Sequence, residues 1–197
     1  MMNKADPTRP AGSWLFRDYA FLALWFVPAA ILTWGIHESA HYATGLVLGY
    51  DMWISFNQVG PVEGSSVSKV HQFLITMSGP LITWIQAVVA FVLIRQTPKL
   101  STPNLSIYPF LFLTLWTRAL AMFISFVSHP NDEARASLLI GCPVWLIPSI
   151  SVGLMFGLTF YGSRGLNVGW KGNIVAYLAA SLVTAAIVFS DQILFAR

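Results

Sequence analysis

The chain contains 197 residues, of which 56% are hydrophobic and only 10% are charged, and its formal net charge is +3. Soluble domains carry about 25% charged residues, so this composition excludes a soluble globular protein and indicates a multi-pass membrane protein. No basic stripe is present to neutralise phosphates, and we therefore expect no nucleic-acid partner. The single Cys142 excludes an intramolecular disulfide and a four-thiolate metal site.

Apolar stretches long enough to cross a bilayer occur five times along the chain. They cover residues 19–36, 72–94, 105–128, 136–163 and 173–190. The first helical pattern continues to about residue 49, and the fourth stretch is long enough to tilt and contains Pro143 and Pro148 as expected kinks. We therefore predict an all-α polytopic membrane protein of about five transmembrane helices, in which residues 1–197 form a single transmembrane domain.

The segment 51–69 differs from the apolar stretches that flank it. Part of it alternates between polar and apolar residues, and two glycine-containing turns follow; the alternating residues are Trp53, Ile54, Ser55, Phe56 and Asn57. This pattern predicts a short membrane-associated strand or hairpin after the first helix. An ordinary amphipathic loop fits the same pattern equally well.

Basic residues are distributed unequally between the two sets of loops that five spans create. Seven lie on the side of the N-terminus: Lys4, Arg9, Arg17, Arg95, Lys99, Arg164 and Lys171. Three lie on the other side: Lys69, Arg135 and Arg197. Because cytoplasmic loops carry the excess of Lys and Arg, we expect a cytoplasmic N-terminus.

The sequence His37-Glu38-Ser39-Ala40-His41 lies in the continuation of the first apolar helix. Residues four apart share a helix face, so both imidazoles can bind one metal ion, and the Glu38 carboxylate can act as general base toward a water molecule there. Ionisable groups inside a membrane are costly and mark functional sites. The structural alternative is a packed cluster that hydrogen-bonds neighbouring helices. Too few histidines are present for a membrane di-iron site, and a bis-histidine haem leaves Glu38 unexplained, so mononuclear zinc is the simplest interpretation.

A catalytic zinc ion needs a third protein ligand and one open position. The candidates in the chain are Asp51, Glu63, His71, His129, Asp132 and Glu133. The hexapeptide 128–133 is the strongest of these segments, since it joins two spans on the same side of the membrane as the end of the first helix. Its carboxylates can instead cap the helix that follows, because carboxylates favour helix N-termini.

Three elements together resemble the site-2 protease family of intramembrane zinc metalloproteases. They are the motif His37–His41, the Gly79-Pro80 pair in the next span, and Asp132 after a further span. The resemblance covers residues 30–135 and implies that His37, His41 and Asp132 ligate zinc, that Glu38 activates the water, and that Gly79 permits close helix approach. It also implies that segment 51–69 binds the substrate as an added strand.

The chain departs from the family pattern around the third ligand. Glu133 stands where the family has glycine, and Asn131 adjoins the aspartate instead of preceding it by several residues. His129 and Asn131 are therefore additional candidates, as metal ligand, proton donor or oxyanion-stabilising group. Arg118, in the middle of the third span, can pair with a carboxylate of the site or with a substrate carbonyl. We expect instead a structural role, in which neighbouring helix ends or snorkelling satisfy its charge.

We therefore expect a zinc metalloendopeptidase that hydrolyses peptide bonds of membrane-embedded proteins or peptides. In this interpretation residues 19–135 form the metalloprotease-like core and residues 136–197 add two C-terminal helices. The protein would be an integral, multi-pass component of a prokaryotic inner membrane. The alternative is a non-catalytic, protease-like subunit that assembles with other membrane subunits and stabilises a larger complex.

Overall fold

The computed structural model describes residues 14–96 and 102–195. Within these ranges the helices are α1 (Phe16–Val47), α2 (Lys69–Gln96), α3 (Thr102–Val127), α4 (Asp132–Leu139), α5 (Leu146–Leu166) and α6 (Gly169–Leu194), and the strands are β1 (Met52–Ile54) and β2 (Val59–Pro61). All helices except α4 are long and apolar enough to cross a membrane, which makes five candidate spans. The predicted all-α membrane architecture with a small strand pair is confirmed.

The predicted fourth span, residues 136–163, is divided in the structure between two helices. The short helix α4 ends at Leu139, and α5 begins at Leu146. Gly141 lies between them with φ +74, a conformation that glycine adopts without steric strain, and Pro143 follows it. The prediction of one continuous helix is therefore wrong here. Pro148 lies in the first turn of α5, where its missing N–H breaks no helical hydrogen bond, so it causes no kink of the expected kind.

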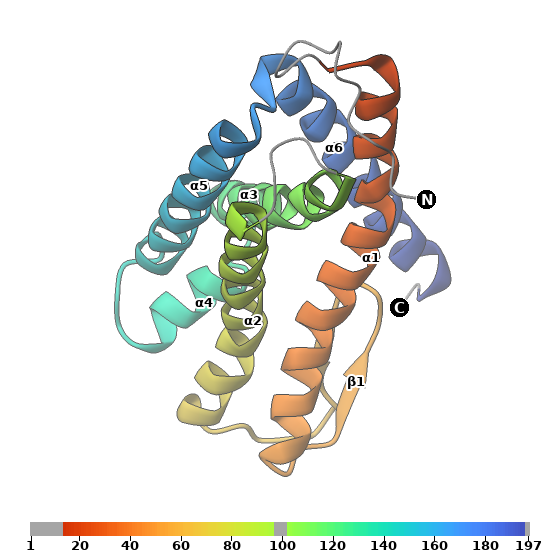
Figure 1. Ribbon diagram of the computed structural model, residues 1–197. Coiled ribbons are helices and arrows are strands. Elements are labelled where there is room, and N and C mark those ends of the chain that lie inside the picture. Colours follow the sequence, from red (N-terminus) through yellow and green to blue (C-terminus); the bar gives the residue numbers. More distant parts are fainter. Residues whose placement is uncertain (1–13, 97–101, 196–197) are drawn as a thin grey trace.

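Strands β1 and β2 form an antiparallel hairpin beside the C-terminal half of α1 (Figure 1). Trp53 lies opposite Gly60 in the register. Met52, which is buried, packs directly on Gly45 of α1, where any larger side chain would overlap its thioether. A second contact joins the hairpin turn to the helix, because Trp34 Nε1 donates to Asn57 Oδ1 at 3.0 Å. The hairpin is thus fixed to the helix that carries the histidine motif.

The hydrophobic core forms where α1, α2, α3, α5 and α6 meet. Helix α1 contacts α2, α3 and α6, and α3 also contacts α5, so the two C-terminal helices belong to the same core as the first three. Many large apolar side chains instead face outward along the long helices, as expected for surfaces in contact with lipid. Short helix α4 packs against α2 and α5 (Figure 1), which brings its first residue toward α1.

Candidate metal centre

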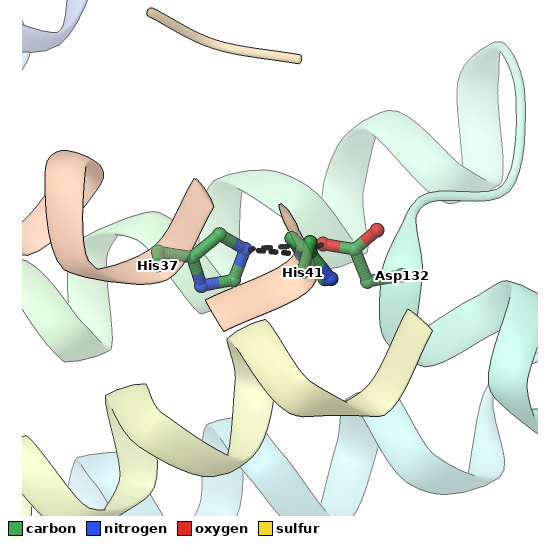
Figure 2. A group of neighbouring side chains, drawn as sticks. All are labelled: His37, His41 and Asp132. Carbon is green, nitrogen blue, oxygen red and sulfur yellow. Dashed lines mark hydrogen bonds and ion pairs between the residues drawn. The ribbon is translucent and has the colours of Figure 1, made fainter. Parts of the chain in front are cut away.

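Three side chains from two helices converge at one point in the structure (Figure 2). His37 and His41 lie one turn apart on α1, and Asp132 is the first residue of α4. The two Nε2 atoms lie 3.2 Å from each other. Asp132 Oδ2 lies 3.2 Å from His37 Nε2 and 3.3 Å from His41 Nε2. These three atoms therefore form a nearly equilateral triangle.

The hydrogen bonds of the outer ring nitrogens fix the tautomer of each histidine. His41 Nδ1 lies 2.6 Å from the carbonyl oxygen of Ile75, which can only accept, so Nδ1 carries the hydrogen. His37 Nδ1 lies 2.9 Å from Thr83 Oγ1, and the Thr83 hydroxyl donates its own hydrogen to the carbonyl of Gly79 at 3.0 Å. Thr83 therefore accepts from His37 Nδ1–H. Both Nε2 atoms then present lone pairs to the centre of the triangle, the arrangement that metal-binding histidines adopt.

The triangle fits a metal ion better than it fits an apolar or hydrogen-bonded cluster. Two imidazole lone pairs and a carboxylate oxygen repel one another at these distances unless a positive charge lies among them. One proton can bridge only one edge of the triangle, whereas a metal ion is bound by all three atoms. Zinc–ligand distances of about 2.0–2.1 Å place two corners of a tetrahedron about 3.3–3.4 Å apart, close to the spacing observed.

Asp132 is held as a carboxylate by its surroundings. Burial raises the pKa of its carboxyl, but positive charge at the triangle, from a proton shared with His37 or His41 or from a metal ion, outweighs burial and keeps the pKa below its usual range. The residue therefore carries a negative charge, which two neutral imidazoles do not supply. Together the three ligands offer the mixed nitrogen and oxygen set that zinc accepts.

Gly79 of α2 lies directly against both imidazoles. A methyl group at this position would overlap His41 Nε2 and would come within 2.7 Å of His37 Cε1. The close approach predicted for the Gly79-Pro80 pair is present, and Pro80 is buried beside it. Only glycine leaves room for the two rings at this helix crossing.

The Gly79→Ala substitution tests this crossing. Alanine favours a helix over glycine by about 1 kcal/mol, yet its methyl group must displace the rings, so we expect α2 to persist while metal affinity falls at least tenfold. The matched control is Gly153→Ala in α5, where an added Cβ has no neighbour within 4 Å. Metal titration and thermal unfolding of both variants make the comparison, and equal metal affinity in the two would contradict it.

Glu38, the expected base, is buried with 8% of its surface exposed and lies in the wall of a cavity of about 740 Å³. The cavity lies between α1, the hairpin and α6, and its lining is mostly apolar. Trp34 and Ile31 of α1 and Ile187 of α6 contribute to this lining. Glu38 is close enough to His41 and Asp132 for their charges to act on it. The carboxylate therefore stands between the candidate ligands and a large apolar space.

Residues 53–57, which were predicted to bind substrate, have two different roles: some line the cavity and others stabilise the hairpin and its contact with α1. Ile54, Ser55 and Phe56 line the cavity. Trp53 donates from Nε1 to the carbonyl of Pro61 at 3.1 Å, so it stabilises the hairpin, and Asn57 accepts from Trp34.

Among the candidates for third ligand, the structure brings only Asp132 to the histidines. His129 is exposed, and its Nδ1 lies 2.9 Å from Ser128 Oγ. His71 lies 2.8 Å from the hydroxyl of Tyr50. Asn131 adjoins the site, and its side-chain oxygen and nitrogen are both buried without a partner among the described protein atoms. Asn131 can therefore interact with a bound molecule, in line with its selection as an additional candidate.

Two partners of the histidines were not identified from the sequence. Thr83 and the Ile75 carbonyl orient the histidines, and a pattern search for metal ligands does not detect such partners. Arg118, for which both a site role and a structural role were considered, pairs with Glu133, a buried carboxylate beside the candidate site, at 2.9 Å.

Asp191, a lone acid in the last span, accepts hydrogen bonds from the backbone N–H groups of Phe56 (2.8 Å) and Asn57 (3.2 Å). It is buried, with 8% of its surface exposed. Its signal was present in the sequence as an ionisable residue directly after the last apolar stretch. Helix α6 is thereby bonded to the turn of the hairpin.

The centre combines three ligands, a neighbouring carboxylate and an apolar cavity, which together suit hydrolysis at a metal ion with access for an apolar substrate. The helical bundle alone does not indicate this chemistry, because one fold can carry many different functions. Comparisons of the chain with protein-family models, with curated proteins and with solved structures found no match.

Proposed function

We propose that the protein is an intramembrane zinc metalloprotease, similar to site-2 proteases, that hydrolyses peptide bonds of membrane-embedded substrates. One observation carries the proposal: the Nε2 atoms of His37 and His41 and Oδ2 of Asp132 form a triangle of lone pairs with edges of 3.2, 3.2 and 3.3 Å. The residues fit zinc in number, chemistry and spacing. Glu38, next to the first ligand, adds the general base that metal binding alone does not require.

A zinc ion at this centre would polarise the scissile carbonyl and lower the pKa of a water molecule from about 15.7 towards about 7. The residues of the chain perform the remaining tasks. Glu38 accepts the proton of the attacking water and delivers it to the leaving nitrogen. Asn131, whose side-chain polar atoms are buried and unpartnered among the described residues, is placed to donate a hydrogen bond to the substrate oxygen.

The substrate proposed for this site is an apolar segment that has left its helical conformation. A peptide bond inside a helix has its carbonyl engaged in a hydrogen bond, so the segment must first become extended. Each strand of the two-stranded sheet has one neighbour among the described residues, so backbone groups at an outer edge can pair with such a segment. The apolar lining of the 740 Å³ cavity beside Glu38 can accommodate its side chains.

The test is cleavage of a single-span peptide by the purified protein in lipid vesicles. We expect cleavage, loss of activity after treatment with a zinc chelator, and recovery when zinc is restored. Stoichiometric metal should leave and return in parallel with activity. A metal-loaded protein that cleaves no membrane peptide, yet is required for the integrity of a larger membrane complex, would contradict the protease and support the non-catalytic subunit.

The proposal includes a cytoplasmic N-terminus in a prokaryotic inner membrane, based on loop charge. Arg17 at the start of α1 and Ser65 in the loop before α2 lie at opposite ends of the first span, and both are exposed. In a Cys142→Ala background, we expect Arg17→Cys to react with an impermeant thiol reagent only in inside-out vesicles and Ser65→Cys only in right-side-out vesicles. The reverse pattern would invert the proposed orientation.

A further inference from the structure

A buried ion pair lies immediately beside the third ligand. Arg118 Nη1 of α3 lies 2.9 Å from Glu133 Oε1 of α4, and the two side chains are only 9% and 2% exposed. Ser151 of α5 donates to the same carboxylate oxygen at 3.2 Å and accepts from Trp84 Nε1 of α2 at 2.7 Å. Residues from two helices, α3 and α5, thus meet on one carboxylate, which belongs to the residue after Asp132.

The helix that supplies Asp132 is short and gains its orientation from these contacts. Helix α4 has 8 residues, too few to be stable in isolation. The N–H of Asn131 donates to Ser125 Oγ at 3.1 Å, and Ser137 Oγ accepts from the N–H of Ile147 at 3.1 Å. Those bonds attach the two ends of α4 to α3 and α5. The ion pair between Arg118 and Glu133 lies in the first turn of α4. Asp132, whose carboxylate faces the candidate metal centre, belongs to the same turn.

We propose that Arg118 and Glu133 are positioning residues, which set the rotation of α4 and thereby hold Asp132 Oδ2 at ligand distance from the histidines. This inference depends on the proposed metal centre. Ligand atoms must lie within about 0.2 Å of their ideal distances, so a small rotation of the first turn moves the oxygen out of range. A pair that served packing alone would have no such requirement, because apolar residues of similar volume often replace buried ion pairs without loss of stability.

Two substitutions together separate positioning from packing. Removing only one partner leaves an unpaired buried charge, which destabilises the fold by itself. An unpaired Arg118 would also exert an electrostatic effect on His37, which lies within range of its charge. The double substitution Arg118→Met with Glu133→Leu removes both charges at similar volume. Arg118→Lys, which keeps a cation opposite Glu133, serves as the conservative variant. The control is Tyr108→Phe, which removes a buried 2.6 Å hydrogen bond to Asn173 on α6, away from α4.

Binding of Co²⁺ to the detergent-solubilised full chain provides a readout that packing alone does not change, since its visible absorption reports the ligand geometry. We expect the double variant to unfold within a few degrees of the unmodified protein, to bind Co²⁺ about 10- to 100-fold more weakly, and to show altered absorption bands. Arg118→Lys should recover most of the affinity. Tyr108→Phe should keep both affinity and spectrum.

The outcomes that would overturn the inference are distinct from failure of the proposed function. Unchanged Co²⁺ affinity and spectrum in a folded double variant would make the pair purely structural, with the metal centre intact. If the double variant does not fold, Glu133→Gln, which keeps the volume but removes the charge opposite Arg118, takes its place, and normal Co²⁺ affinity and spectrum in that variant would also make the pair purely structural. Absence of Co²⁺ binding by the unmodified protein would overturn the metal centre itself, and with it this inference.

Discussion

Glu38→Gln is expected to leave the metal bound and the fold intact while lowering the cleavage rate by about 10²- to 10⁴-fold, the usual contribution of a general base. Glutamine has nearly the same volume and keeps a polar group in the cavity wall, but its amide cannot accept the proton of the attacking water. The candidate ligands His37 and His41 on the same helix remain in place, so metal content is expected to be unchanged. The measurement is the cleavage rate of a vesicle-embedded peptide together with metal content.

The matched control is Glu63→Gln, at an exposed position in the loop between the hairpin and α2. It alters the same functional group and the net charge equally, so it should cleave at the unmodified rate. A Glu38→Gln protein that cleaves as fast as this control would exclude the proposed mechanism. Loss of metal from Glu38→Gln would instead place Glu38 among the ligands.

Substitutions at the three candidate ligands should lower metal binding itself and not merely activity. We expect His37→Ala and His41→Ala to retain no stoichiometric zinc, because each leaves two ligand atoms of the triangle. Asp132→Asn keeps the shape of the side chain but loses the charge, so its zinc affinity should fall at least tenfold. Metal analysis after dialysis at matched protein concentration measures these losses.

The control substitutions are His129→Ala and His71→Ala. Both remove an imidazole from the chain, but His129 is exposed and bonded to Ser128, and His71 contacts Tyr50. Zinc content should therefore be unchanged in both. Metal loss confined to His129→Ala would overturn the choice of Asp132 as third ligand and would make Asp132 a helix-capping residue.

The sequence predicted most of the fold because membrane composition constrains it strongly. Long apolar stretches in a bilayer must form helices, since no water is available to satisfy their backbone groups. The hairpin was visible as an alternation at Trp53-Ile54-Ser55, a weaker signal that the structure confirms with a three-residue pairing. The break between α4 and α5 was not predicted, because hydropathy continues across Gly141 and Pro143 although the backbone does not.

For the candidate site, local spacing was informative and long-range pairing was not. His37 and His41 share a face by helix geometry alone, so their proximity followed from the sequence. Asp132, 95 positions from His37, was selected by resemblance, and the structure places it 3.2 Å from that histidine. The pairing of Arg118 with Glu133, and of Asp191 with the hairpin turn, depends on how helices pack together, and a single sequence does not encode that in any local pattern.

The bond between Asp191 and the hairpin turn makes the register of α6 important for the chemistry on α1. Residues in a helix are about 100° apart around its axis, so one residue inserted or deleted between the start of α6 and Asp191 would turn the carboxylate away from Phe56 and Asn57. Such a change would preserve a helix of nearly the same length and hydropathy. Homologues of this protein should therefore vary in the outward-facing residues of α6 while tolerating length changes only beyond this aspartate.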